Sequence, residues 1–123
     1  MSDFATPGAN AFLNGTALPT TLYVQGHTGN PGTNGTNNVA AETDRIAVSS
    51  WSVASGGSKS STALAEILNA AAAETWTHVT YWSAASGGTC WFVEDLASDV
   101  PIEVGDTIQI DAGSSTITVP VWA

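Results

Sequence analysis

The side chains best suited to acid–base or nucleophilic chemistry are few: two histidines, His27 and His78, and one cysteine, Cys90. A Ser-His-acid triad needs a histidine that is aimed at a nucleophile and oriented by a carboxylate. His78 lies between Thr77 and Val79 in a predicted strand, and none of the serines stands in a Gly-x-Ser-x-Gly elbow. We therefore interpret both histidines as structural.

Two pairs of carboxylates could serve glycoside hydrolysis, which needs two acids that flank one bond. The pairs are Glu94 with Asp95 and Asp106 with Asp111. Adjacent residues of a strand point to opposite faces, which argues against the first pair. We interpret all four as solvated strand ends, because Asp and Glu are mostly exposed in folded proteins. The sequence thus assigns no catalytic residue.

Metal and cofactor sites find little support. One cysteine and two widely spaced histidines do not form a zinc set. Calcium stays open, because Asp and Asn oxygens are plentiful in the loops, although no Asp-x-Asp-x-Asp-Gly loop is present. The glycine-rich stretch GHTGNPGTNGTNN lacks the Gly-Lys-Ser/Thr end of a P-loop. We expect neither a metal nor a cofactor.

The single cysteine excludes an intrachain disulfide. The flanking sequence Thr89-Cys90-Trp91 is typical of a strand interior, which favours a buried, inert thiol over a nucleophile. Residues 1–15 have no basic start and no continuous apolar run, so a secretory signal is not expected. We expect folding in a cytoplasm, where the Asn-Gly-Thr sequences at 14–16 and 34–36 are turns rather than glycosylation sites.

Charge limits the possible partners. Arg45 and Lys59 are the 2 basic side chains against 11 Asp and Glu residues, which gives a formal net charge of −9. Nucleic acids and anionic membranes both require a basic surface, so neither partner is expected. With so few ion pairs available, apolar burial and backbone pairing must supply most of the stability.

A short phrase occurs twice, as WSVASGGS at 51–58 and as WSAASGGT at 82–89. The second copy separates two apolar stretches, TWTHVTYW and TCWFVE, in the pattern of a β-hairpin. Gly87 and Gly88 are available for left-handed turn positions, which glycine adopts without steric cost. The phrase therefore predicts a strand end followed by a turn.

Alternating apolar residues predict further strands. These cover TLYVQ at 21–25, DRIAVSSWSV at 44–53, DTIQID at 106–111 and STITVPV at 115–121, and the hairpin strand is expected to place Trp76, His78, Thr80 and Trp82 on one face. An N-terminal arm at 1–19 and a long Gly/Asn-rich loop at 26–43 complete the layout. We expect one domain over 1–123, an all-β antiparallel β-sandwich of about seven short strands with Gly/Asn-rich turns.

Residues 62–74, TALAEILNAAAAE, admit two interpretations. Leu64, Ile67 and Leu68 follow helical spacing, and the alanines favour a helix. The pattern around the segment points away from a helix, and both interpretations stay open at this point.

With these segments in order, the sequence resembles a family of small structural proteins of tailed bacteriophages, of the head-decoration or tail-fibre type. The segments that carry the resemblance are TTLYVQGHTGNPG, DRIAVSSWSVASGGSKSST, TWTHVTYWSAASGGTCWF and IEVGDTIQIDAGSSTITV, within Phe4 to Val119. The resemblance implies a β-sandwich that is a component of the virion. It also implies a short strand over Leu64 to Leu68 with the alanines as a connecting turn, which we take as the prediction, with the helix as the alternative. It brings no catalytic residues with it.

Two virion roles follow from this resemblance. In the preferred interpretation the protein is non-enzymatic and decorates, or cements, the capsid, because no heptad run for a coiled-coil shaft is present. Its partners are then the major capsid protein or other virion proteins, and it forms a homo-oligomer, with a trimer as the candidate state. The alternative is a tail-fibre or tail-tip module, in which the loop from Gly26 to Asn38 contacts the host surface.

Overall fold

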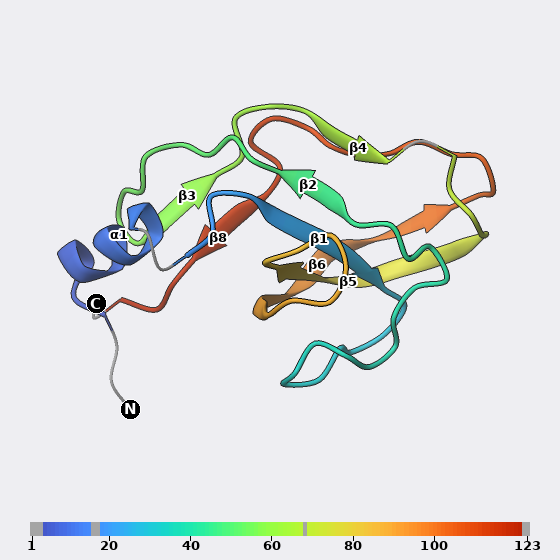
Figure 1. Ribbon diagram of the computed structural model, residues 1–123, viewed down its shortest axis with the longest axis horizontal. Coiled ribbons are helices and arrows are strands. Elements are labelled where there is room, and N and C mark those ends of the chain that lie inside the picture. Colours follow the sequence, from blue (N-terminus) through green and yellow to red (C-terminus); the bar gives the residue numbers. More distant parts are fainter. Residues whose placement is uncertain (1–3, 16–17, 68, 122–123) are drawn as a thin grey trace.

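The computed structural model in Figure 1 describes residues 4–15, 18–67 and 69–121. Within these ranges the chain forms one helix and eight strands. In chain order they are α1 (Thr6–Asn14), β1 (Leu22–His27), β2 (Ile46–Val48), β3 (Ser58–Ser60), β4 (Ala65–Ile67), β5 (Glu74–Trp82), β6 (Cys90–Ile102), β7 (Ile108–Ile110) and β8 (Thr116–Thr118).

The main sheet has four antiparallel strands in the order β2-β1-β5-β6, and two smaller antiparallel pairs, β4-β7 and β3-β8, accompany it. The β4-β7 pair faces the apolar side of the main sheet, because Ile108 and Ile110 line the same hollow as Val24 and Val79. Sheet packed on sheet around apolar side chains is a β-sandwich. The predicted antiparallel all-β fold is confirmed.

The segment expected as an N-terminal arm contains helix α1, which the sequence analysis missed. Gly8 and Asn10 lower its helix propensity, so packing rather than propensity stabilises it. Ala9 and Leu13, one turn apart, are its buried residues. The side-chain carbonyls of Asn10 and Asn14 accept hydrogen bonds from the backbone of residues 54–57, so the helix is attached to the first copy of the repeated phrase.

The ambiguous segment forms strand β4, which pairs with β7. The predicted strand is confirmed at Ala65–Ile67, and the helical alternative is wrong; Leu68 lies outside the described residues. Pairing with β7 buries Ile67 and leaves Glu66 exposed, which a strand accomplishes by simple alternation. The alanines at 70–73 connect β4 to β5 without regular structure, as predicted.

Both copies of the repeated phrase turn the chain, as predicted. In the first copy, Ser55 and Ser58 exchange backbone hydrogen bonds of 2.9 and 3.1 Å around Gly56 and Gly57, whose φ angles are 61° and 81°. In the second copy, the paired glycines at 87 and 88 have φ angles of 64° and 78° and join β5 to β6. Successive positive φ angles are the reason for the double glycine.

The predicted face assignment of β5 is wrong at Trp76. This residue was expected beside His78, but it lines the apolar face with Val79 and Tyr81. The β5-β6 register shifts between Trp76 and His78, and such a bulge reverses the side-chain alternation on one side of it. The strand predicted over 44–53 is also shorter than expected, because only Ile46–Val48 pair with β1.

Trp76 lies directly on the backbone of Gly26 in β1. A methyl group on Gly26 would overlap Cε2, Cδ2 and Cζ2 of the indole. Trp76 is only 3% exposed, so the ring cannot move aside into solvent. The φ angle of Gly26 is not in the left-handed region, so the backbone conformation alone would accept other residues. Glycine is required at position 26 because the indole leaves no space for a side chain.

Gly26→Ala is expected to lower the free energy of unfolding by about 1–3 kcal/mol, because it overpacks the core at the indole. The matched variant Gly8→Ala, in a helix position with room for the methyl group, is expected to raise it by about 0.5–1 kcal/mol. Urea unfolding of both variants and the wild type measures these changes. Equal stability of Gly26→Ala and the wild type would contradict the packing described here.

Candidate functional site

His27 attaches the long loop to the sheet. Its imidazole is fully buried, with Nδ1 2.8 Å from the carbonyl oxygen of Asn37 and Nε2 2.8 Å from Oγ1 of Thr80. Because a carbonyl only accepts, Nδ1 carries the proton and Nε2 accepts from the threonine hydroxyl. Burial lowers the pKa of His27 below its ordinary value, against the opposing effect of the loop backbone. The neutral ring is engaged on both sides and serves as a structural link.

The second histidine and the adjacent carboxylates do not converge on one point. Nε2 of His78 is 3.7 Å from Oδ1 of Asp95, and Nδ1 is 2.7 Å from Oγ1 of Thr77. Glu94 points to the opposite face of the sheet, where it accepts a hydrogen bond of 2.8 Å from the hydroxyl of Tyr81. Glu94 and Asp95 are therefore separated by the sheet, which fits the alternation expected from the sequence.

The other two carboxylates hold turns. Oδ2 of Asp106 accepts from the backbone N–H of Glu103 at 2.9 Å, and Oδ1 of Asp111 accepts from the amide of Gln109 at 3.0 Å. Both aspartates are exposed. Within residues 4–15, 18–67 and 69–121, no group of three or more His, Cys, Asp or Glu side chains is arranged to hold a metal ion.

Cys90 packs beneath the long loop. A methyl group on Gly35 would lie 2.6 Å from its sulfur, so the loop backbone approaches the thiol closely. Sγ is 3.6 Å from the carbonyl oxygen of Phe92, and burial raises the pKa of the thiol. A thiol with a raised pKa is a poor nucleophile, since the thiolate is the reactive form.

Arg45 holds the second copy of the repeated phrase. Its guanidinium carbon lies 4.4 Å from the centre of the Trp82 ring, a cation–π distance. Nη1 donates hydrogen bonds of 2.7 and 2.8 Å to the carbonyl oxygens of Ala84 and Gly87. One side chain thus fixes both the tryptophan and the turn that follows it.

Lys59 contacts the tryptophan of the first copy and joins it to helix α1. Its ammonium lies 5.0 Å from the centre of the Trp51 ring and donates to the carbonyl oxygen of Leu13, in the last turn of α1, at 3.1 Å. A cation is favourable at the C-terminal end of a helix. Lys59 is only 6% exposed, and burial lowers the pKa of its ammonium group. The sequence analysis noted both cations but did not predict that each would lie over a tryptophan. The tryptophan that begins each copy of the repeated phrase could have indicated it.

The loop between β1 and β2 extends beyond the His27 end of β1 (Figure 1). The N–H of Gly32 donates to Oδ1 of Asn30 at 2.8 Å, and the amide of Asn38 donates to the carbonyl oxygen of Asn30 at 2.9 Å. Pro31 and Gly35 are buried beneath it, whereas residues 33, 34 and 36–39 are exposed. The loop is therefore folded against the sheet and bonded to itself, with Asn and Thr side chains outward.

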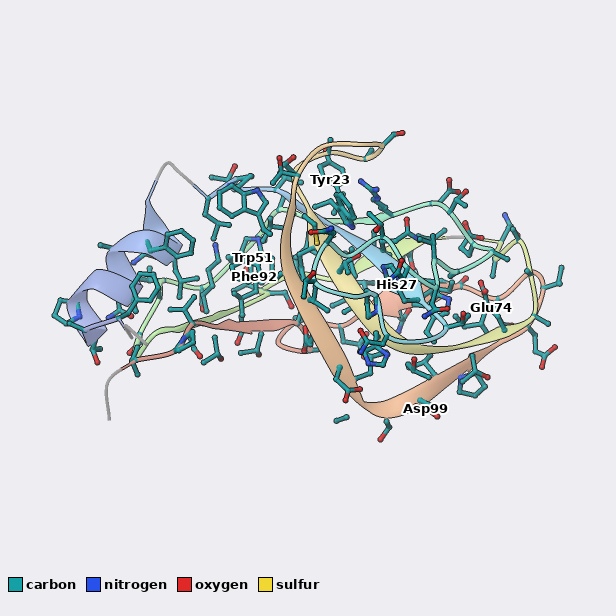
Figure 2. All side chains as sticks on the ribbon, turned by 90° about the horizontal axis from the view of Figure 1, so that it is seen from below. Tyr23, His27, Trp51, Glu74, Phe92 and Asp99 are labelled. Carbon is teal, nitrogen blue, oxygen red and sulfur yellow. The ribbon has the colours of Figure 1, made fainter. Side chains whose placement is uncertain are left out.

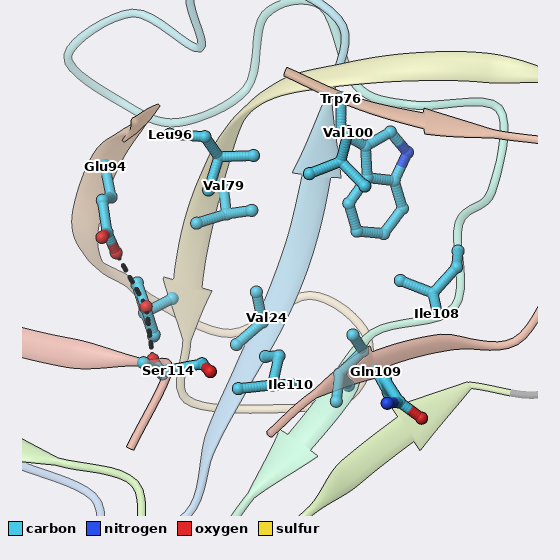
Figure 3. Close-up of a pocket in the computed structure, with 13 residues that line it drawn as sticks. Val24, Trp76, Val79, Glu94, Leu96, Val100, Ile108, Gln109, Ile110 and Ser114 are labelled. Atoms are coloured by element: carbon cyan, nitrogen blue, oxygen red, sulfur yellow. Dashed lines mark hydrogen bonds between the residues drawn. The ribbon is translucent and has the colours of Figure 1, made fainter. Parts of the chain in front are cut away.

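A second surface lies along β6, the last strand of the main sheet. Within the described part of the chain, no strand pairs with its outer edge. An apolar hollow of about 240 Å³ separates β6 from β7 (Figure 3). Its apolar lining comes from Val24, Ile46, Trp76, Val79, Leu96, Val100, Ile108 and Ile110.

Polar groups form one wall of this hollow. The hydroxyl of Tyr81 bridges Glu94 and Ser115, at 2.8 Å from Oε2 and 2.6 Å from Oγ (Figure 3). Burial raises the pKa of the Tyr81 hydroxyl, so it stays protonated. The indole N–H of Trp76 is buried and has no hydrogen-bond partner among the described residues. The hollow suits an apolar side chain better than a charged reactant.

Comparison with protein families identifies the chain. A family model described as podophage GP4 fiber I protein gp80 matches residues 5–118. The chain belongs to this family. The predicted resemblance to phage structural proteins is thereby confirmed, and the protein is a virion structural protein of the fibre type. No curated protein matches the chain.

The family description favours one of the two roles expected from the sequence. It names a fibre protein, which agrees with the tail-fibre alternative and gives no support to capsid decoration, the interpretation preferred from the sequence. The absence of a heptad run was the argument for decoration, and it addressed only coiled-coil shafts. No helix within the described ranges is long and apolar enough to cross a membrane.

Acid is expected to destabilise the fold through His27. Because its folded-state pKa lies below the ordinary value of 6.5, the unfolded chain takes up a proton that the folded chain does not, so stability falls as pH drops through about 6.5. Urea unfolding between about pH 7.5 and pH 5 measures this loss. His27→Gln should show a smaller loss, whereas His78→Gln, which keeps His27, should retain it. Identical profiles for His27→Gln and the wild type would contradict the assignment.

Proposed function

We propose that the protein is a non-enzymatic subunit of a phage fibre that acts by binding surfaces rather than by turnover. The family match over residues 5–118 carries this proposal. The positions of the chemically capable side chains support it, since His27 links a loop, Cys90 packs beneath that loop, and Asp106 and Asp111 hold turns. Other virion proteins are its partners, and a homo-oligomer, with a trimer as the candidate state, provides repeated weak contacts.

The loop at 28–38 is the surface that we assign to host contact. Asn and Thr side chains donate and accept hydrogen bonds without charge, which suits the hydroxyl groups of a glycan or a polar protein surface. The loop is held by His27 beneath it and by the Asn30 contacts within it, so little conformational entropy is lost on binding. This preorganisation, together with the outward Asn and Thr side chains, is the reason for assigning host contact to the loop.

The fibre role predicts where the protein lies on the particle. Antibodies against it are expected to label intact virions at the fibres of the tail or neck when viewed by electron microscopy. An antibody against the major capsid protein provides the matched control for labelling of the head. Label spread evenly over the head would contradict the fibre role and restore capsid decoration.

Host contact predicts that charge introduced on the loop weakens binding. The double variant Thr33→Lys, Thr36→Lys is expected to bind host cells about tenfold less tightly, a change of about 1.4 kcal/mol. Thr62→Lys provides the control, because Thr62 is exposed in the connection between β3 and β4, outside the loop. Fluorescently labelled protein and flow cytometry measure the binding. If all variants bind like the wild type, the loop is not the contact surface.

A further inference from the structure

Strand β6 is unusually long and open. It has 13 residues, it ends the main sheet, and residues 97–101 are exposed. A free strand edge carries unpaired backbone donors and acceptors, to which another strand can add. Figure 2 shows Asp99 at the outer side of the bend in β6. The exposed residues 97–101 lie toward the opposite end of the strand from Cys90, which packs beneath the loop assigned to host contact.

A groove follows the inner side of this edge. The hollow between β6 and β7 is continued by a second one of about 260 Å³ between β6 and β8, and Tyr81 and Glu94 line both. Val100 lines the first hollow and is 41% exposed, so the groove opens to solvent at the strand edge. A strand added to β6 would direct every second side chain toward this groove.

The charge around the groove is of one sign. Glu94 lines it, and Glu103, Asp106 and Asp111 lie in the connections on either side of β7. Asp95 and Asp99 lie on β6 next to the groove-lining Glu94 and Val100, with their side chains on the opposite face of the strand. Neither basic side chain of the protein offsets them. Lys59 is buried against Trp51. Arg45 contacts Gln25, whose side chain points to the face of the main sheet opposite to the hollow, because the adjacent Val24 lines the hollow.

This charge selects the occupant. In an antiparallel β6-to-β6 contact between two copies of the chain, Asp95 and Asp99 of both strands would lie on the same face of the joined sheet, and like charges on paired strands are destabilising. A segment rich in Lys or Arg would instead be attracted to the edge and oriented by it. Charge complementarity therefore points to a different, basic chain.

We propose that the groove along β6 binds an extended segment of another virion protein in which basic residues alternate with apolar ones. The segment adds to β6 as a fifth strand of the main sheet, its apolar side chains enter the groove beside Leu96 and Val100, and its basic side chains face the carboxylates. Main-chain hydrogen bonds supply affinity in this mode, and the pockets for alternate side chains supply specificity. The inference goes beyond the proposed host contact and rests on the fibre assignment only for the source of the segment.

The test uses the purified full chain and two synthetic peptides, one in which lysine alternates with valine and one in which glutamate replaces each lysine. The lysine peptide is expected to bind at least about tenfold more tightly than the glutamate peptide in isothermal titration calorimetry. It should also shift the NMR signals of the β6 backbone amides and of the Trp76 indole N–H. Added salt should weaken the binding, because it screens exposed charges.

Two matched variants locate the binding. Val100→Lys places a charge in the groove and should weaken binding of the lysine peptide about tenfold, whereas Val53→Lys, at a position 81% exposed in the first repeated phrase, should not. Equal binding of the two peptides, or unchanged binding by Val100→Lys, overturns the proposal. Self-association of the wild type that Val100→Lys abolishes would also overturn it, in favour of a second copy. Host-cell binding plays no part in this experiment, so its result is independent of the proposed host contact.

Discussion

The contact between the indole of Trp76 and the backbone of Gly26 is the constraint on which the rest of the structure depends. It is possible only because a bulge in the β5-β6 pairing turns Trp76 to the apolar face. The residues after the bulge keep their own alternation, so Val79 and Tyr81 share the apolar face with Trp76 while Thr80 faces the long loop. The irregularity thereby places Trp76 in the wall of the hollow and leaves Thr80 on the other face, where its hydroxyl donates a hydrogen bond to His27.

The two faces of the main sheet are covered by different means. A small sheet, β4-β7, covers one face and leaves a groove beside β6, where the covering strands end. The other face is covered by a loop that has almost no regular structure and is fixed by individual contacts, from His27 and Cys90. An apolar cover gives a site for apolar side chains, whereas a polar cover gives a surface suited to hydrogen bonding. One modest domain can in this way carry two surfaces of different chemistry.

The sequence predicted those features that depend on local patterns. Alternation identified β1, β2, β5, β7, β8 and the first part of β6, but not β3 or the second half of β6. Double glycines identified both turns, because positive φ angles leave few other residues possible. The strand at 65–67 was predicted against its helical propensity from the family resemblance. Features that depend on distant contacts were missed. Helix α1 exists through packing at Ala9 and Leu13, and the bulge at Trp76 follows from a register that no local pattern encodes.

The candidate surfaces were predictable to different degrees. The Gly/Asn-rich loop was visible in composition, but its attachment through His27 required a partner, Thr80, that is 53 positions away. The groove along β6 is lined by residues of β6, β7 and β8, although β7 and β8 pair with other strands, so the groove depends on how the strands are arranged in the fold. A surface built from one segment can be predicted from the sequence of that segment. A groove built from several distant segments cannot.

The side-chain contacts of Arg45 and Lys59 also bear on durability outside the cell. Trypsin and related digestive enzymes must seat an arginine or lysine side chain in their own pocket before they cleave, and this chain offers two such residues. One is clamped against Trp82 and two turn carbonyls, and the other is buried in a strand against Trp51. Cleavage at either then requires local unfolding first, which protects a folded fibre protein in protease-rich surroundings.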